Sequence, residues 1–127
     1  MTTLIKSATI IDSSSPYHNQ QKDILIINGI IDKIANSIVK KESYQVVTLD
    51  NLHVSCGWFD TSVSFGEPGF EERETIKNGL NVAAKSGFTA VAVNANSNPV
   101  IDSKSAVEFL IHKAKGFATN LYPIAAL

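Results

Sequence analysis

With 127 residues, the chain is long enough to form one compact domain with a core of its own. Hydrophobic residues make up 44% of the sequence and charged residues 18%, and the formal net charge is -1, which is ordinary for a soluble globular protein. No basic run and no basic stripe interleaved with aromatic residues is present, which argues against a nucleic-acid partner. The apolar runs are far shorter than the roughly 20 residues that cross a bilayer, which argues against a membrane segment.

The first residues of the chain and its single cysteine indicate in which cellular compartment we expect the protein. The first six residues do not combine a charged segment with an apolar stretch, as a secretory signal would. Because Cys56 is the only cysteine, it cannot form an internal disulfide or share a zinc ion with a second cysteine of the same chain. We therefore expect a cytoplasmic protein in which Cys56 is a small buried packing residue.

Residues 1–56 predict a small antiparallel β module. Short runs rich in β-branched residues, separated by polar or glycine-containing stretches, indicate strands at 4–11, 23–27, 30–34, 44–49 and 52–55. Asn28-Gly29, between two of these runs, predicts a tight hairpin, since a type I′ turn needs a positive φ at both central residues.

From residue 57 onward the pattern changes to strands that alternate with helices. The expected elements are a strand at 58–64, a helix at 71–86, a strand at 88–93, a loop at 94–99, a helix at 102–115 and a strand at 120–127. This order implies right-handed parallel crossovers, and hence the opening units of an α/β sheet or barrel in residues 57–127. The strands are apolar enough to be buried on both faces.

The sequence also predicts which residues form the apolar faces of the two helices. The first has Ile76, Leu80, Ala83 and Ala84 on its apolar face. Its first turn would carry the acidic side chains that the helix dipole favours, and Gly87 stands where a C-terminal cap belongs. The apolar face of the second helix consists of Ala106, Val107, Leu110, Ile111 and Ala114.

The most specific pattern begins at Gly57. From residue 57 to residue 69 the sequence reads Gly-Trp-Phe-Asp-Thr-Ser-Val-Ser-Phe-Gly-Glu-Pro-Gly. This segment resembles Pro-Gly-Phe-Ile-Asp-x-His-x-His-x-Arg-Glu-Pro-Gly of the dihydroorotase and cyclic-amide hydrolase family, which is part of the amidohydrolase superfamily. The family is also matched, in order and spacing, by the hairpin at Asn28-Gly29 and by Glu74-Thr75-Ile76, Gly87-Phe88-Thr89 and residues 96–102.

The resemblance implies an α/β fold in which the small β module is followed by the first βα units of a TIM-type barrel, with the chain stopping in the third strand. In the family, the His-x-His pair ends the first barrel strand and holds zinc, because residues i and i+2 of a strand point to the same side. The metal lowers the pKa of a bound water. Here those positions are Ser62 and Ser64, and the family's substrate-carboxylate arginine falls on Gly66.

A neutral hydroxyl is a poor metal ligand beside imidazole, thiolate or carboxylate. We therefore expect no zinc and no catalytic residue in this chain. Asn96 matches a family asparagine that contacts substrate, although it could instead shape the turn before Pro99. Asp60 matches a family aspartate, although it could simply hydrogen-bond to backbone. None of the histidines has metal-ligand spacing to another, so we expect surface positions for His18, His53 and His112.

Three hypotheses remain open. In the first, the chain is a non-catalytic dihydroorotase-like protein that acts as a structural or regulatory partner in pyrimidine biosynthesis. The resemblance suggests aspartate carbamoyltransferase as a partner, and unpaired barrel strands suggest self-association. In the second, a working hydrolase interconverts N-carbamoyl-L-aspartate and dihydroorotate, with the metal held by residues beyond Leu127. In the third, the scaffold is reused as a small-molecule binding module.

Overall fold

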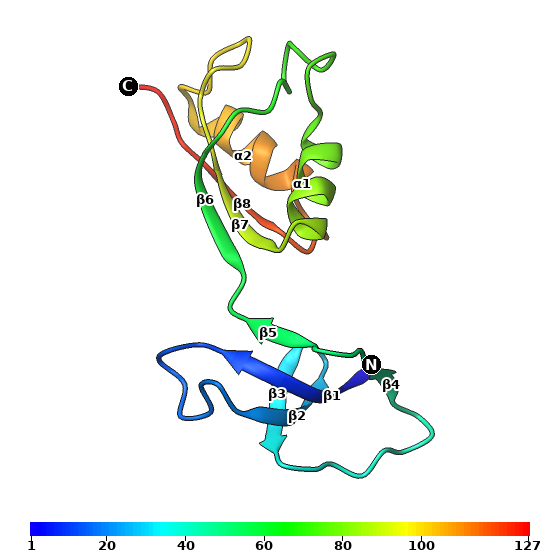
Figure 1. Ribbon diagram of the computed structural model, residues 1–127. Helices are drawn as coiled ribbons and strands as arrows, with labels where there is room; N and C mark the ends of the chain where they lie inside the picture. Colours follow the sequence, from blue (N-terminus) through cyan, green and yellow to red (C-terminus); the bar gives the residue numbers. More distant parts are fainter. The chain divides into compact units, whose positions relative to one another are not determined.

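A computed structural model describes residues 1–127, and the chain divides into two compact units, residues 1–56 and residues 57–127 (Figure 1). The first unit is a small β module, and the second contains parallel strands joined by helices. The fold is therefore α/β, with a β module followed by parallel βα units in the order that the resemblance implies for the start of a TIM-type barrel. No helix is both long enough and apolar enough to span a membrane.

The N-terminal sheet is built on the long strand β1. Strands β1 (Thr2–Ile11), β2 (Gln21–Ile27) and β3 (Ile30–Ala35) form the expected antiparallel meander. In addition, β4 (Gln45–Val47) and β5 (His53–Ser55) pair with β1 in parallel, one near each end of it. The module is therefore a mixed sheet, because residues 36–44 carry the chain back before β4 begins.

The hairpin between β2 and β3 has the turn that the sequence predicted. Asn28 and Gly29 both adopt positive φ values, 51° and 82° respectively. Apolar side chains from three parts of the module then meet in its core, where Leu4, Leu25 and Ile38 are buried together. Cys56, which we expected to be buried, is instead exposed, because it lies beyond the last paired residue of β5.

Asp23 is the one acidic side chain buried inside this module. It is only 1% exposed and forms an ion pair with Lys6. Its two carboxylate oxygens also accept backbone N–H groups, from Ser7 at 2.9 Å and from Ile38 at 2.8 Å. Ser7 has a positive φ of 53° and lies where the pairing of β1 with β2 shifts register. Asp23 therefore holds an irregular part of β1 and the segment after β3 in place.

The same contacts determine how Asp23 titrates. Burial acts to raise its pKa, but the hydrogen bonds from Lys6, Ser7 and Ile38 favour the carboxylate more strongly, so the pKa lies below its ordinary value. A carboxyl group with a lowered folded-state pKa stabilises the fold above its unfolded-state pKa of about 4. That contribution is lost as the pH falls below this value through the folded-state pKa.

Asp23→Asn should therefore destabilise the β module at pH 7 by about 1–3 kcal/mol, because the new NH2 group would face donors. Urea unfolding followed by circular dichroism, with hydrogen exchange at β1 and β2 amides, would measure the loss. Asp32→Asn on exposed β3 is the matched control and should change stability little. The difference in free energy of unfolding between the wild type and Asp23→Asn should be smaller at pH 3 than at pH 7. An equal difference in free energy of unfolding at both pH values would contradict this role for the Asp23 charge.

The C-terminal unit is a three-stranded parallel sheet covered on one face by two helices (Figure 1). Its strands are β6 (Trp58–Val63), β7 (Phe88–Val93) and β8 (Asn120–Pro123), in that order across the sheet. The helices are α1 (Ile76–Lys85) and α2 (Lys104–Lys113). The buried core between these layers consists of Phe65, Ile76, Leu80, Val91, Val93, Ile101, Leu110 and Leu121.

Helix α1 begins later than the sequence predicted. Thr75 is its N-cap, and the Thr75 hydroxyl accepts the backbone N–H of Asn78 at 3.2 Å. Residues 71–74, expected in the first helical turn, instead close a loop in which Gly66 N–H donates to the carbonyl of Glu74 at 2.9 Å. The acidic residues therefore precede the helix. Its end is as predicted, because Gly87 follows the helix with a φ of 89°.

The structure also differs from the predicted burial and from the predicted bounds of α2, β6 and β8. Helix α2 is shorter than 102–115, and Ile111 is 46% exposed rather than on its buried face, whereas Ile101 before the helix is buried. Strand β6 was expected to be buried on both faces, yet Trp58 is 63% exposed and Phe59 54% exposed. Regular pairing in β8 ends at Pro123 rather than at 127. The helices cover one face of the sheet only, which leaves apolar strand residues exposed.

Candidate functional site

Four polar side chains meet where β6 and β7 end, and we call them the serine–asparagine cluster: Ser62, Ser64, Asn94 and Asn96. The Asn94 side-chain amide donates to the Ser62 hydroxyl at 3.1 Å, and the Asn96 amide donates to the Ser64 hydroxyl at 2.6 Å. Parallel pairing brings them together, since the backbone N–H of Asn94 donates to the carbonyl of Val63 at 2.9 Å. The cluster thus lies at the carboxyl ends of the strands, where barrel enzymes place their ligands.

Arg73 joins this cluster from the loop between β6 and α1. Its guanidinium group donates to the Ser64 hydroxyl at 3.0 Å and lies over the ring of Phe70, with Cζ 5.9 Å from the ring centroid. Our sequence analysis did not single out Arg73. The available signal was its uniqueness, since Arg73 is the only arginine in the sequence.

The acidic neighbours of Arg73 form hydrogen bonds elsewhere in the loop. Glu71 accepts the backbone N–H of Gly69 at 3.0 Å, and that hydrogen bond holds the pKa of Glu71 below its ordinary value. Glu74 accepts the backbone N–H of Thr75 at 2.9 Å and the side-chain amide of Asn78 at 3.0 Å. No carboxylate forms an ion pair with Arg73.

Two glycines keep this loop compact. A Cβ atom on Gly66 would lie 1.8 Å from the carbonyl oxygen of Phe70, so this position cannot carry an arginine unless the loop moves. A Cβ on Gly69 would lie 2.0 Å from the carbonyl oxygen of Asn98, and Gly69 has a φ of +96°. Close backbone contact with the neighbouring loop therefore requires glycine at position 69.

Glu67 fixes the loop to both helices. One carboxylate oxygen accepts the backbone N–H of Ile76 at the start of α1, at 3.0 Å. The other lies 2.9 Å from the ammonium group of Lys113 on α2, and the Glu67 side chain is only 12% exposed. The first contact satisfies a free N–H of the helix terminus and places negative charge near the positive end of the α1 dipole.

The remaining candidate residues do not form a metal centre. Asp60 accepts the backbone N–H of Ser62 at 3.0 Å, the backbone role considered for it above. Nowhere in the chain do three or more His, Cys, Asp or Glu side chains lie together so that they could hold a metal ion. All three histidines are exposed, as expected: His18, His53 and His112.

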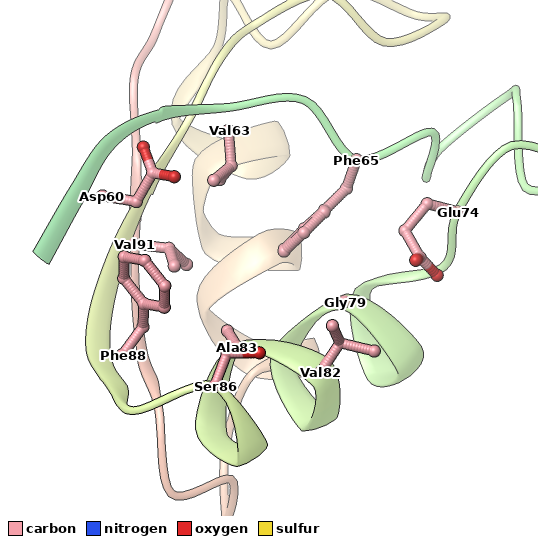
Figure 2. A pocket seen from close by; sticks show the side chains of 10 residues that line it. All are labelled: Asp60, Val63, Phe65, Glu74, Gly79, Val82, Ala83, Ser86, Phe88 and Val91. Carbon is pink, nitrogen blue, oxygen red and sulfur yellow. The ribbon is translucent and has the colours of Figure 1, made fainter. Parts of the chain in front are cut away.

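The apolar pocket in Figure 2 is a separate feature from the cluster. It has a volume of about 210 Å3 and lies between β6, β7 and α1, lined mainly by apolar residues such as Phe65, Val82 and Phe88. Asp60 and Glu74 also line it, and each carboxylate accepts a backbone N–H, from Ser62 and from Thr75 respectively. The pocket is therefore mainly apolar, with two carboxylates in its lining.

Comparison with known proteins identifies the family. The sequence model of the family described as "Dihydro-orotase-like" matches residues 53–127. The chain belongs to this family. It is 37% identical over 129 aligned positions to the dihydroorotase of Ruminiclostridium cellulolyticum, covering 100% of this chain and 29% of that relative. The dihydroorotase of Pelotomaculum thermopropionicum is 38% identical, again over 100% of this chain and 29% of the relative. The chain thus spans about three-tenths of the length of these curated relatives.

Solved structures support the fold of this dihydroorotase-like chain. The L-hydantoinase (dihydropyrimidinase) from Arthrobacter aurescens superposes with a TM-score of 0.76 at 15% identity, over 97% of this chain and 27% of that one. A D-hydantoinase gives a TM-score of 0.65 at 22% identity, over 97% of this chain and 26% of that one. At such identities the likeness concerns the fold alone.

The zinc implied by the family resemblance does not fit the donors that this chain presents. The resemblance assigns the first-strand ligand positions to Ser62 and Ser64, whose hydroxyls already accept hydrogen bonds from neutral amides. Zinc sites in proteins use imidazole, thiolate or carboxylate groups. Asp60, two residues before Ser62, accepts a backbone N–H, and no group of three or more potential metal ligands lies together anywhere in the chain.

Glu67→Gln should lower the free energy of unfolding of the C-terminal unit by about 1–2 kcal/mol, since the charge that pairs with Lys113 and the α1 dipole is removed. Denaturant titration monitored by the fluorescence of Trp58 would measure the change. Glu108→Gln is the matched control, because Glu108 pairs with Lys104 at 3.6 Å with both side chains largely exposed. It should cost less than about 0.5 kcal/mol. Equal effects of the two substitutions would refute a special role for Glu67.

Proposed function

We propose that this dihydroorotase-like chain is non-catalytic and serves as a structural or regulatory partner in pyrimidine biosynthesis. One observation carries the proposal: Ser62 and Ser64, at the positions assigned to metal-binding histidines, form hydrogen bonds to Asn94 and Asn96. Hydroxyl and amide groups neither bind zinc well nor act as general bases near neutral pH. The cluster therefore lacks both a means of activating water and a group to accept its proton.

The alternative is a working hydrolase that interconverts N-carbamoyl-L-aspartate and dihydroorotate. The curated relatives named dihydroorotase favour this alternative. It requires every metal ligand to come from residues beyond Leu127, because the ends of β6 and β7 contribute none. Under both proposals we infer a cytoplasmic location, because the exposed thiol of Cys56 remains free most readily in a reducing compartment.

The expected result for the full-length protein is that dialysis after zinc loading leaves well below one zinc ion per chain, and that no dihydroorotate hydrolysis is detectable. Elemental analysis and an absorbance assay would measure the two quantities. Ser62→His with Ser64→His provides the comparison, since it restores two imidazoles at i and i+2 and should raise zinc retention. Stoichiometric zinc in the wild type that Ser62→Ala or Ser64→Ala releases, or metal-dependent turnover, would refute the proposal.

A partner role is supported by the sheet face that the helices leave uncovered. Phe59 on β6 and Tyr122 on β8 contact each other edge to face, with ring centroids 5.9 Å apart, and each is 54% exposed. Ile124 beyond β8 is 43% exposed. Edge strands β6 and β8 each have only one neighbouring strand, and such edges pair readily with other chains. We propose a second copy of this chain as the partner, with aspartate carbamoyltransferase as the heterologous alternative.

Light scattering across a concentration series should show dimers or larger species that dissociate on dilution. Phe59→Ser with Tyr122→Ser should shift this equilibrium toward monomer, because less apolar surface would be buried on association. Val39→Ser is the matched control, since Val39 is 83% exposed but lies in the β module. A monomer at all concentrations, with cooperative unfolding and no binding of an apolar dye, would rule out self-association. Complex formation with added aspartate carbamoyltransferase alone would favour the heterologous partner.

A further inference from the structure

The apolar pocket between β6, β7 and α1 is lined by two carboxylates and by no basic side chain (Figure 2). Asp60 lines it from β6 and Glu74 from the loop before α1, and neither takes part in an ion pair of the chain. We propose that this pocket binds a small organic cation, a primary ammonium ion carried by a single ring or a short hydrocarbon chain. Such binding is independent of the proposed function, because the pocket is separate from the serine–asparagine cluster.

The pocket has space because small residues line one face of α1. The α1 residues in its lining lie three or four positions apart, as residues on one helix face do, and they are Gly79, Val82, Ala83 and Ser86. A Cβ atom on Gly79 would lie 2.3 Å from the ring of Phe65, so glycine allows this ring to pack directly against the helix. The small side chains after Gly79 leave the rest of the space between α1 and the sheet open.

The size and the walls of the pocket suit a ligand with one ring. An apolar cavity of about 150 Å3 can bind benzene. With a volume of about 210 Å3, this pocket has room for one ring and a short arm. Most of its lining is apolar and would contact the hydrocarbon part of a ligand: Val63, Phe65, Val82, Ala83, Phe88 and Val91.

The two carboxylates favour a positive charge on the ligand. Asp60 accepts the backbone N–H of Ser62, and Glu74 accepts the backbone N–H of Thr75 and the side-chain amide of Asn78. Because an ionised carboxylate offers about four acceptor positions, both groups can accept a further donor. An ammonium group that leaves water for apolar surroundings needs an opposite charge beside it, and this pocket supplies one. An anion would be repelled by both carboxylates.

The aromatic rings of the pocket add to this preference. The ring of Phe88 contacts Trp58 edge to face, with the ring centroids 5.7 Å apart, and Phe65 packs against Gly79. No cation of the chain lies over either phenylalanine ring. The face of an aromatic ring attracts an ammonium group. Because these rings are already held in place, they lose little conformational entropy when a ligand binds.

Isothermal titration calorimetry of the full-length protein with benzylammonium chloride tests the site. Benzyl alcohol serves as the neutral ligand of similar size, and benzoate serves as the anion. Benzylammonium should bind saturably and at least about 10-fold more tightly than benzyl alcohol, the factor that corresponds to a charge-assisted hydrogen bond, and benzoate should not bind. Asp60→Asn should raise the dissociation constant of benzylammonium about 10-fold, although the asparagine oxygen can still accept the N–H of Ser62.

Glu72→Gln is the matched control, because Glu72 is an exposed carboxylate near Glu74 that lies outside the pocket. It should leave the affinity unchanged, whereas Ala83→Leu should abolish binding by filling the space. Near-ultraviolet circular dichroism would show whether each variant is folded, and Asp60→Asn tests the site without a change of volume if Ala83→Leu does not fold. No saturable heat in the folded wild type, equal affinities for benzylammonium and benzyl alcohol, or equal effects of Glu72→Gln and Asp60→Asn would overturn the site.

Discussion

The arrangement of the C-terminal unit depends on the carboxylate of Glu67. The residue lies in the loop after β6, yet its two oxygens contact the first backbone N–H of α1 and the ammonium group of Lys113 on α2. A single side chain thereby links the loop to both helices. Because it is largely buried, these contacts are less screened by water than those of a surface ion pair. The loop between Phe65 and Thr75 consequently has a defined path.

That path determines where the polar groups of the candidate site lie. Once Glu67 is held, Gly66 approaches the backbone of Phe70 and Glu74, and Gly69 approaches Asn98 of the next loop. The closed loop brings Arg73 back over the end of β6 to Ser64. The convergence of a guanidinium, a hydroxyl and an amide is thus a consequence of loop packing rather than of any single strand.

Strands and tight turns could be predicted from the sequence because their signals are local. The positive φ values at Asn28, Gly29 and Gly87 follow from the residue types that tolerate them. The start of α1 could not be predicted in the same way. Acidic residues before an apolar run are typical of a first helical turn, but here tertiary contacts of Gly66 and Glu74 keep them in a loop.

The residues of the candidate site likewise divide into those that the sequence could predict and those that depend on tertiary structure. The pairing of Ser62 and Ser64 with Asn94 and Asn96 follows from parallel strands ending at one edge, and Asn96 was singled out from its resemblance to a family residue. Arg73 was missed because its role depends on the folded path of ten residues. Likewise, the exposure of Trp58 and Phe59 depends on which layers cover the sheet, which the apolar composition of β6 does not specify.

The serine–asparagine cluster connects the ends of β6 and β7 through side-chain hydrogen bonds. Two imidazoles that face a common metal gain their fixed orientation largely from the metal and from hydrogen bonds to their second ring nitrogens. Serine and asparagine side chains satisfy one another directly, through contacts of 3.1 Å and 2.6 Å. No charge is left without a counter-ion in the cluster except that of Arg73. Neutral hydrogen bonds therefore connect the ends of β6 and β7, and the one charged group beside them, Arg73, donates to the same Ser64 hydroxyl.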